Sequence, residues 1–141
     1  MSGYVFLEHM SDALIESYGE SVEEAFSNAA CGLIDTMVDI RTINHQIESS
    51  FDIRGSDLEN LLYNWLESVL LKIYIDELVF SYFKVVIKKI STGFSLVGIG
   101  KGEKLDILKH KAKTAVKSVT YHLMRIVESK GKVSARFLLD L

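Results

Sequence analysis

Two short acidic motifs near opposite ends of this 141-residue chain carry the residues best suited to chemistry. Asp12 closes the segment Glu-His-Met-Ser-Asp at 8–12, and Asp140 and Leu141 are the last two residues of the sequence. The α-carboxylate of Leu141 places a second anionic group beside the Asp140 side chain. If the fold brings Asp12 to them, three hard oxygen ligands converge on one point, and such ligands suit Ca²⁺, Mg²⁺ or Mn²⁺ better than a soft metal.

Position along the chain also permits a simpler interpretation of these carboxylates. Asp12 could shape a turn, and Asp140 could be a solvated chain end, because Asp favours turns and termini are commonly exposed. Glu8 and His9 could in principle act with Asp12 as acid, base and orienting group, but no nucleophile with a matched base lies nearby. We therefore expect no catalytic residue and no enzyme activity from this chain alone.

Other motifs of enzyme and cofactor sites do not fit the sequence. The run Gly-Ile-Gly-Lys-Gly at 98–102 lacks the helix start that lets backbone amides cradle a phosphate, so no nucleotide cofactor is predicted. A single cysteine, Cys31, excludes an internal disulfide and a cysteine-based zinc site.

Length and composition predict one soluble globular domain spanning residues 1–141. Hydrophobic residues make up 48% of the chain and charged residues 25%, and no low-complexity stretch could serve as a linker. The start lacks the basic and apolar regions of a secretory signal, and charges interrupt the most apolar run, Leu61–Phe80. We expect a cytoplasmic protein with no membrane contact, and the sequence leaves its oligomeric state open.

Hydrophobic spacing predicts an α+β fold with antiparallel pairing. Ser21 with Glu24 and Ser56 with Glu59 resemble capping boxes at the starts of two long helices, the second being the main core helix. A third, shorter helix is predicted over Leu105–Val119 from its apolar spacing. The seven strands are predicted at 4–6, 13–18, 47–53, 80–90, 94–99, 124–127 and 133–139. No repeated strand-helix-strand units call for a doubly wound parallel sheet.

Lysines cluster in the segment Lys101–Lys117, although the whole chain has a formal net charge of −3. An overall acidic charge argues against a dedicated high-affinity nucleic-acid domain. The segment could be an ordinary solvated face. It could also contact RNA phosphates transiently or an acidic surface of a protein partner.

Two blocks of the sequence resemble the archease family. The opening Tyr-Val-Phe-Leu-Glu-His-Met-Ser-Asp at 4–12 is similar to the family's Y-x-F-x-E-H-T-A-D. The block Lys-Thr-Ala-Val-Lys-Ser-Val-Thr-Tyr-His at 113–122 is similar to its K-T-x-V-K-A-V-T-Y-H. The helix starting near Glu23, the core helix at 57–66 and the terminal Phe-Leu-Leu-Asp-Leu follow in the family's order, so the resemblance covers the whole chain.

This resemblance implies a function in tRNA splicing and RNA repair. Archeases are non-enzymatic activators of the tRNA-splicing RNA ligase, and they promote its guanylylation and multiple turnover. The family's metal site, placed on this sequence, is Asp12, Asp140 and Leu141, with Ca²⁺ the first expectation and Mg²⁺ or Mn²⁺ the alternatives. A general chaperone or adaptor for RNA-processing proteins, with a purely structural metal, is the alternative function.

Overall fold

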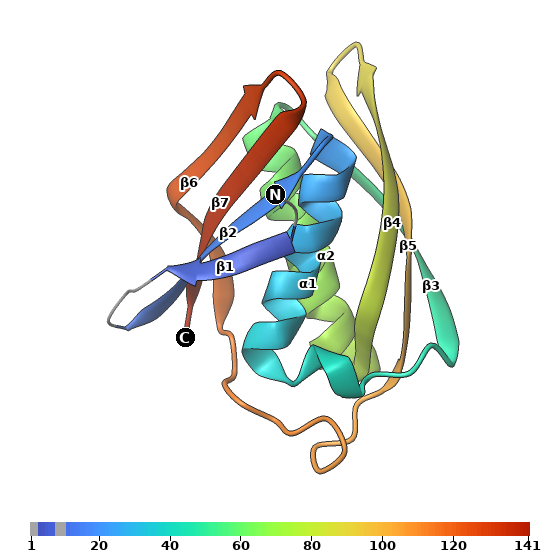
Figure 1. The fold of residues 1–141 in the computed structure, drawn as a ribbon. Coiled ribbons are helices and arrows are strands. Elements are labelled where there is room, and N and C mark those ends of the chain that lie inside the picture. Colours follow the sequence, from blue (N-terminus) through green and yellow to red (C-terminus); the bar gives the residue numbers. More distant parts are fainter. Residues whose placement is uncertain (1–2, 8–10) are drawn as a thin grey trace.

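The computed structural model describes residues 3–7 and 11–141. Its two helices are flanked by strands that come from both ends and from the middle of the chain (Figure 1). The elements, in chain order, are β1 (Gly3–Leu7), β2 (Asp12–Gly19), α1 (Val22–Met37), the 3₁₀ turn η1 (Ile40–Thr42), β3 (Ile47–Gly55), α2 (Leu58–Asp76), β4 (Leu78–Ile90), β5 (Gly93–Lys104), β6 (Ser118–Ser129) and β7 (Lys132–Asp140).

The strands form two antiparallel sheets with the helices between them. One sheet has the order β1-β2-β7-β6 and the other the order β3-β5-β4. Figure 1 shows α1 and α2 side by side, with the first sheet on one flank and the second on the other. The predicted α+β class, the seven strands and the antiparallel pairing are confirmed.

Side-chain caps explain where the helices begin. Ser21 is the N-cap of α1 and its hydroxyl accepts the Glu24 N–H at 3.1 Å, as predicted. The cap of α2 lies one residue later than predicted, because Asp57, and not Ser56, accepts the Asn60 N–H at 2.7 Å. The Asn60 side chain in turn accepts the Ser56 N–H at 2.9 Å. Ser56 therefore lies just before the cap and is bonded to the first turn of α2. No helix among the described residues is long and apolar enough to cross a membrane.

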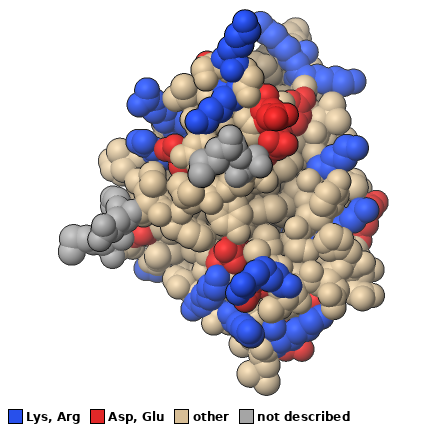
Figure 2. Space-filling model, in the orientation of Figure 1, with Lys and Arg blue, Asp and Glu red and all other residues tan. Residues whose placement is uncertain are grey.

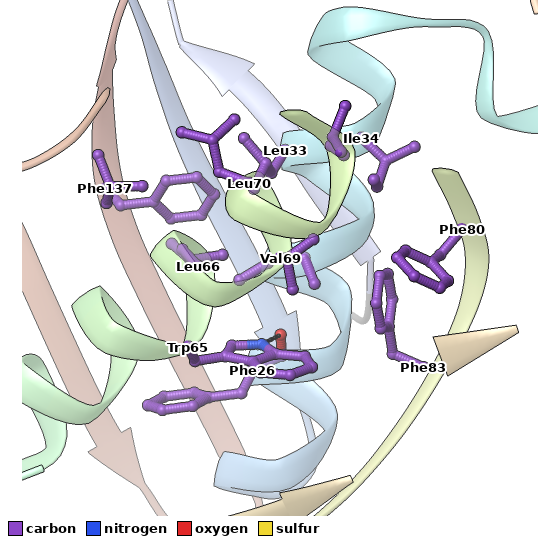
Figure 3. Close-up of a cluster of buried hydrophobic side chains, with 14 of the residues drawn as sticks. Phe26, Leu33, Ile34, Trp65, Leu66, Val69, Leu70, Phe80, Phe83 and Phe137 are labelled. Atoms are coloured by element: carbon purple, nitrogen blue, oxygen red, sulfur yellow. Dashed lines mark hydrogen bonds between the residues drawn. The ribbon is translucent and has the colours of Figure 1, made fainter. Parts of the chain in front are cut away.

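The core lies between the helices and both sheets, and Trp65 of α2 is its largest side chain (Figure 3). Trp65 is fully buried and packs edge to face against Phe51 and Phe83 of the second sheet. Its indole N–H donates to the Phe26 carbonyl of α1 at 2.9 Å, so the one polar group of the ring is satisfied. Together, these contacts of Trp65 hold α2 against α1 and against β3 and β4.

Alternate glycines in β5 let the second sheet pack closely. The strand predicted to end at Ile99 continues through the run at 98–102 and ends at Lys104, as β5. A Cβ on Gly102 would lie 1.7 Å from the Val79 carbonyl oxygen, and one on Gly100 would lie 3.0 Å from the Phe80 ring. These glycines are therefore packing residues of a strand and not a phosphate loop.

The third predicted helix is wrong, because residues 105–117 form turns and an extended connection. Asp106 accepts the N–H groups of Leu108 and Lys109 at 3.1 Å each, a local turn that competes with helical hydrogen bonding. Lys111 has φ 55°, which no helix tolerates. Leu108 is 90% exposed, so the helical spacing of apolar residues does not correspond to a buried face.

Hydrogen bonds to other elements hold this irregular segment. The Asp39 N–H donates to the His110 carbonyl and the Lys113 N–H to the Met37 carbonyl, each at 2.8 Å. His110 is fully buried. The segment leads into β6, which begins at Ser118, six residues before the predicted strand start at Met124.

Candidate functional site

Asp12 and Asp140 lie opposite each other on neighbouring strands. Asp12 is the first residue of β2 and Asp140 the last of β7, and the two are Cα partners in the antiparallel ladder. Directly opposed residues have Cβ atoms about 4.5–5.5 Å apart. The fold therefore brings together two carboxylates that 127 intervening residues separate in the sequence.

Both carboxylates belong to the outer face of the four-stranded sheet. Along the β2–β7 ladder, Ile15 with Phe137 and Ser17 with Ala135 point inward, and all four are fully buried. Side chains alternate between faces along a strand, so the partners Asp12 with Asp140 and Glu16 with Arg136 occupy the opposite face. Asp140 is exposed and Asp12 is half-buried.

A third strand end continues the same row. Ser118, the first residue of β6, is the other Cα partner of Asp140, and the Lys117 N–H donates to the Asp140 carbonyl at 2.7 Å. The row Asp12, Asp140 and Ser118 thus runs across three adjacent strands. No sequence pattern pointed to Ser118, because its position depends on the early start of β6.

The donor set of this row fits a hard divalent cation. Two opposed carboxylates repel each other across a strand pair, and a cation between them removes that repulsion. Leu141 follows Asp140 directly and packs partly against the core, so its backbone carboxylate lies next to the row. Among residues 3–7 and 11–141, no three His, Cys, Asp or Glu side chains cluster as metal ligands, so the set rests on two side chains and the Leu141 carboxylate. Glu8 and His9 lie outside the described residues.

Most lysines of the basic segment Lys101–Lys117 interact with other groups of the protein. Lys109 donates to Glu103 at 2.7 Å and Lys113 to Asp35 at 3.2 Å. Lys104 donates to the Asp76 carbonyl at 2.9 Å, and the Lys101 ammonium lies 5.4 Å from the centre of the Tyr82 ring. Figure 2 shows Lys and Arg mixed with Asp and Glu at the lower end of the molecule, where Figure 1 places this segment.

Two exposed apolar side chains lie in the same segment. Leu108 is 90% exposed and Ile107 is 65% exposed, and they lie between Asp106 and Lys109. Ile107 also borders an apolar hollow of about 180 Å³, which Ile73 and Val79 line from other elements. The segment therefore presents a mixed apolar and basic surface and not a purely cationic one.

These features define an α+β protein whose two helices lie between antiparallel sheets and whose first sheet ends in paired carboxylates. Residues 4–141 match the model of the Archease protein family (MTH1598/TM1083), and the chain belongs to this family.

Relatives match over the full chain. The chain is 40% identical to the protein archease of Sulfolobus acidocaldarius over 141 residues and 41% identical to that of Pyrococcus abyssi over 142 residues, in each case covering 100% of both proteins.

Solved structures share the fold. The solution structure of Methanobacterium thermoautotrophicum protein 1598 has a TM-score of 0.85 at 34% identity, with 100% of both chains covered. The crystal structure of a Thermotoga maritima archease, described as a possible chaperone, has a TM-score of 0.62 at 20% identity, covers 96% of this chain and 94% of its own, and supports the fold alone.

Proposed function

We propose that this protein activates a tRNA-splicing RNA ligase, promoting its guanylylation and multiple turnover, through a divalent-metal site at the paired ends of β2 and β7. The observation that carries the proposal is the direct opposition of Asp12 and Asp140 on the outer sheet face. The ligase as partner is what the resemblance to archeases implies, and membership of that family supports it. We assign the chemistry to the ligase, because the sequence shows no nucleophile with a matched base near Asp12.

The ion would be held by the side chains of Asp12 and Asp140 and by the α-carboxylate of Leu141. Ca²⁺ is the first candidate because it accepts six to eight oxygen ligands in flexible geometry, and Mg²⁺ and Mn²⁺ are the alternatives. When bound, it would supply coordination positions that oxygen atoms of a partner could fill. The chain's own residues hold the ion at an exposed sheet end, where a partner surface can reach it.

A ligase assay tests the proposal. Guanylylation of a purified RNA ligase is measured with wild-type protein, Asp12→Asn and Asp140→Asn, each of which removes one charge at nearly constant shape. The control is Asp52→Asn, an equal charge change at an exposed position of β3 in the other sheet. We expect the first two variants to stimulate guanylylation at least tenfold more weakly than wild type, and the control to stimulate it as strongly as wild type. Full stimulation by Asp12→Asn and Asp140→Asn would refute the role of the site.

The exposed apolar tip favours a second candidate, a general chaperone or adaptor with a structural metal. Leu108 and Ile107 offer a contact for apolar surface on a partner, flanked by basic residues. Leu108→Ser would then reduce suppression of aggregation for proteins other than the ligase. If Leu108→Ser changes nothing while Asp140→Asn abolishes ligase stimulation, the adaptor function fails and the activator function stands.

Transient RNA contact through Lys101–Lys117 is the remaining part of the proposal. Lys111 and Lys117 are the exposed lysines best placed for it, because Lys101, Lys104, Lys109 and Lys113 already contact groups within the molecule. The double variant Lys111→Gln with Lys117→Gln should weaken RNA binding and flatten its salt dependence. Unchanged binding of a labelled RNA by this variant would remove RNA from the partners of the segment.

A further inference from the structure

Two arginines oppose each other on the outer face of the first sheet. Arg125 of β6 and Arg136 of β7 are Cα partners, so their side chains leave the sheet on the same side. Their neighbours in the ladder confirm the direction, since Ile126 and Ala135 pack into the core. Like charges directly opposite each other destabilise a strand pair. An anion bound between the two guanidinium groups would remove this repulsion.

The protein supplies only one nearby carboxylate for these two guanidinium groups. The Arg136 Nε donates to Glu16 at 3.3 Å. The other oxygen of Glu16 accepts the Tyr18 hydroxyl at 2.6 Å, so this carboxylate is shared already. Within the part of the chain that the structure describes, Arg125 makes no ion pair and lies exposed. Nearby, the Lys132 ammonium lies 5.5 Å from the centre of the Tyr18 ring and adds to the positive charge of this face.

The arginines border a hollow and do not lie on a flat surface. A depression of about 200 Å³ is lined by Arg125 and Arg136 together with Glu16, Val127 and Ser134. Ser134 lies opposite Tyr18 and Val127 in the two ladders, so its hydroxyl belongs to the same outer face. Two guanidinium groups and a hydroxyl thus surround one recess with donors.

The hollow is separate from the candidate metal site. Asp140 and Arg136 are four residues apart on β7, and at about 3.3 Å per residue the separation is roughly 13 Å. A single phosphate cannot touch both positions. Both do lie on one face of one sheet, so a longer ligand could span them.

We propose that Arg125, Arg136 and Ser134 form a phosphate-binding subsite for a nucleotide or an RNA strand. Guanidinium groups bind phosphate through paired N–H donors, and the tetrahedral arrangement of phosphate oxygens lets two such groups and a hydroxyl bind from different directions. A carboxylate from a protein partner would be planar and singly charged, and Glu16 already occupies the place beside Arg136 that such a group would take. The recess therefore favours phosphate over an acidic side chain of a protein partner. This subsite is independent of the ligase proposal, and its test contains no ligase.

The first experiment uses inorganic phosphate as the probe. Melting of the full-length protein is compared in phosphate and in chloride at equal ionic strength, for wild type, Arg125→Gln and Arg125→Lys. The control is Arg54→Gln, the same charge change at an exposed position of β3. At about ten times the Kd, phosphate should raise the melting temperature of wild type and Arg54→Gln by about 3–6 °C. Arg125→Gln should lose this shift, and Arg125→Lys should keep only part of it.

Stability without phosphate separates binding from folding. Removing one of two opposed like charges should leave the melting temperature of Arg125→Gln in chloride equal to wild type or higher. Equal phosphate shifts in wild type and Arg125→Gln, or no shift in wild type, would overturn the subsite.

The second experiment distinguishes the sources of the phosphate and the competing class of partner. Binding of a short labelled RNA with a 5′-phosphate is compared with the same RNA ending in a 5′-hydroxyl. At least about tenfold tighter binding of the phosphorylated RNA assigns the subsite to a terminal phosphate, and equal binding that Arg125→Gln weakens assigns it to the backbone. If an acidic peptide displaces phosphate from wild type while neither RNA does, the site is a protein contact and the proposal is wrong.

Discussion

Glu103 accepts a hydrogen bond from the buried ring of His110, with 2.8 Å between Oε2 and Nε2. The Asp106 N–H donates to the other ring nitrogen, Nδ1, at 2.9 Å, which places the proton of the neutral ring on Nε2. The same Glu103 oxygen accepts the Asn44 N–H at 2.9 Å and the Lys109 ammonium at 2.7 Å. One carboxylate therefore fastens the irregular segment 105–117 to β5 and to the connection after α1.

This arrangement predicts an acid-sensitive contribution to stability. The hydrogen bond from the Asn44 N–H, followed by those from His110 and Lys109, lowers the pKa of Glu103 from 4.5 to about 2. A depressed pKa in the folded state stabilises the fold fully above pH 4.5, and this stabilisation is lost as the pH falls towards about 2.

Glu103→Gln should therefore lower the free energy of unfolding at neutral pH by about 1–3 kcal/mol. The difference from wild type should shrink as the pH falls below 4.5. Urea unfolding across that range measures it, with Glu48→Gln on the exposed part of β3 as the control. A difference that stays constant with pH would show that Glu103 acts through packing and not through its charge.

Local sequence patterns predicted most of the elements, and tertiary contacts decided the rest. The N-cap of α1 at Ser21 and the pair of strands predicted at 80–90 and 94–99 could be predicted because caps and neighbouring strands depend on adjacent residues. The segment after β5 was not, because its conformation depends on the buried His110 and on bonds to residues 39 and 37, which lie more than 70 positions away.

For the candidate sites too, the sequence predicted some residue types and positions but not which residues face each other. Asp12 and Asp140 could be singled out by residue type and by their place beside apolar strands. That they face each other depends on the β2–β7 register, which no local pattern specifies. Arg125 and Arg136 showed no motif at all. A strand alternation places each on an outer face, but their opposition requires the β6–β7 register after the irregularity between Thr120 and Arg125.

Loss of either opposed carboxylate should weaken metal binding without unfolding the protein. Ca²⁺ should raise the melting temperature of wild type, because an ion that binds only the folded state stabilises it by mass action. Asp12→Asn and Asp140→Asn should each lower Ca²⁺ affinity at least about tenfold, roughly 1.4 kcal/mol. Calorimetric titration with Ca²⁺ and Mn²⁺ gives the affinities, and Asp52→Asn should match wild type. Unchanged affinity in both site variants would eliminate the metal site.

Truncation of Trp65 should be the most damaging single change in the core. Trp65→Ala removes a fully buried ring that contacts Phe51 and Phe83, and should cost about 3–5 kcal/mol. Trp65→Phe keeps most of the apolar volume but loses the hydrogen bond to the Phe26 carbonyl, so it should cost less. Leu71→Ala, on the half-exposed side of α2, is the control and should cost least. Chemical denaturation orders the three, and any other order would contradict this packing.

Extending the chain beyond Leu141 tests the backbone carboxylate as a metal ligand. An added residue converts the α-carboxylate of Leu141 into a neutral amide carbonyl beside Asp140, at the end of β7. We expect a short C-terminal tag to lower Ca²⁺ affinity at least about tenfold, on the order of 1.4 kcal/mol, and to reduce stimulation of ligase guanylylation in parallel. The matched control is a tag of the same length before Met1, which should change either quantity much less. Both forms are assayed at equal concentration by calorimetry and in the ligase reaction. If the C-terminally tagged protein binds Ca²⁺ as tightly as the untagged one, Leu141 supplies no ligand and the site rests on the two aspartates alone.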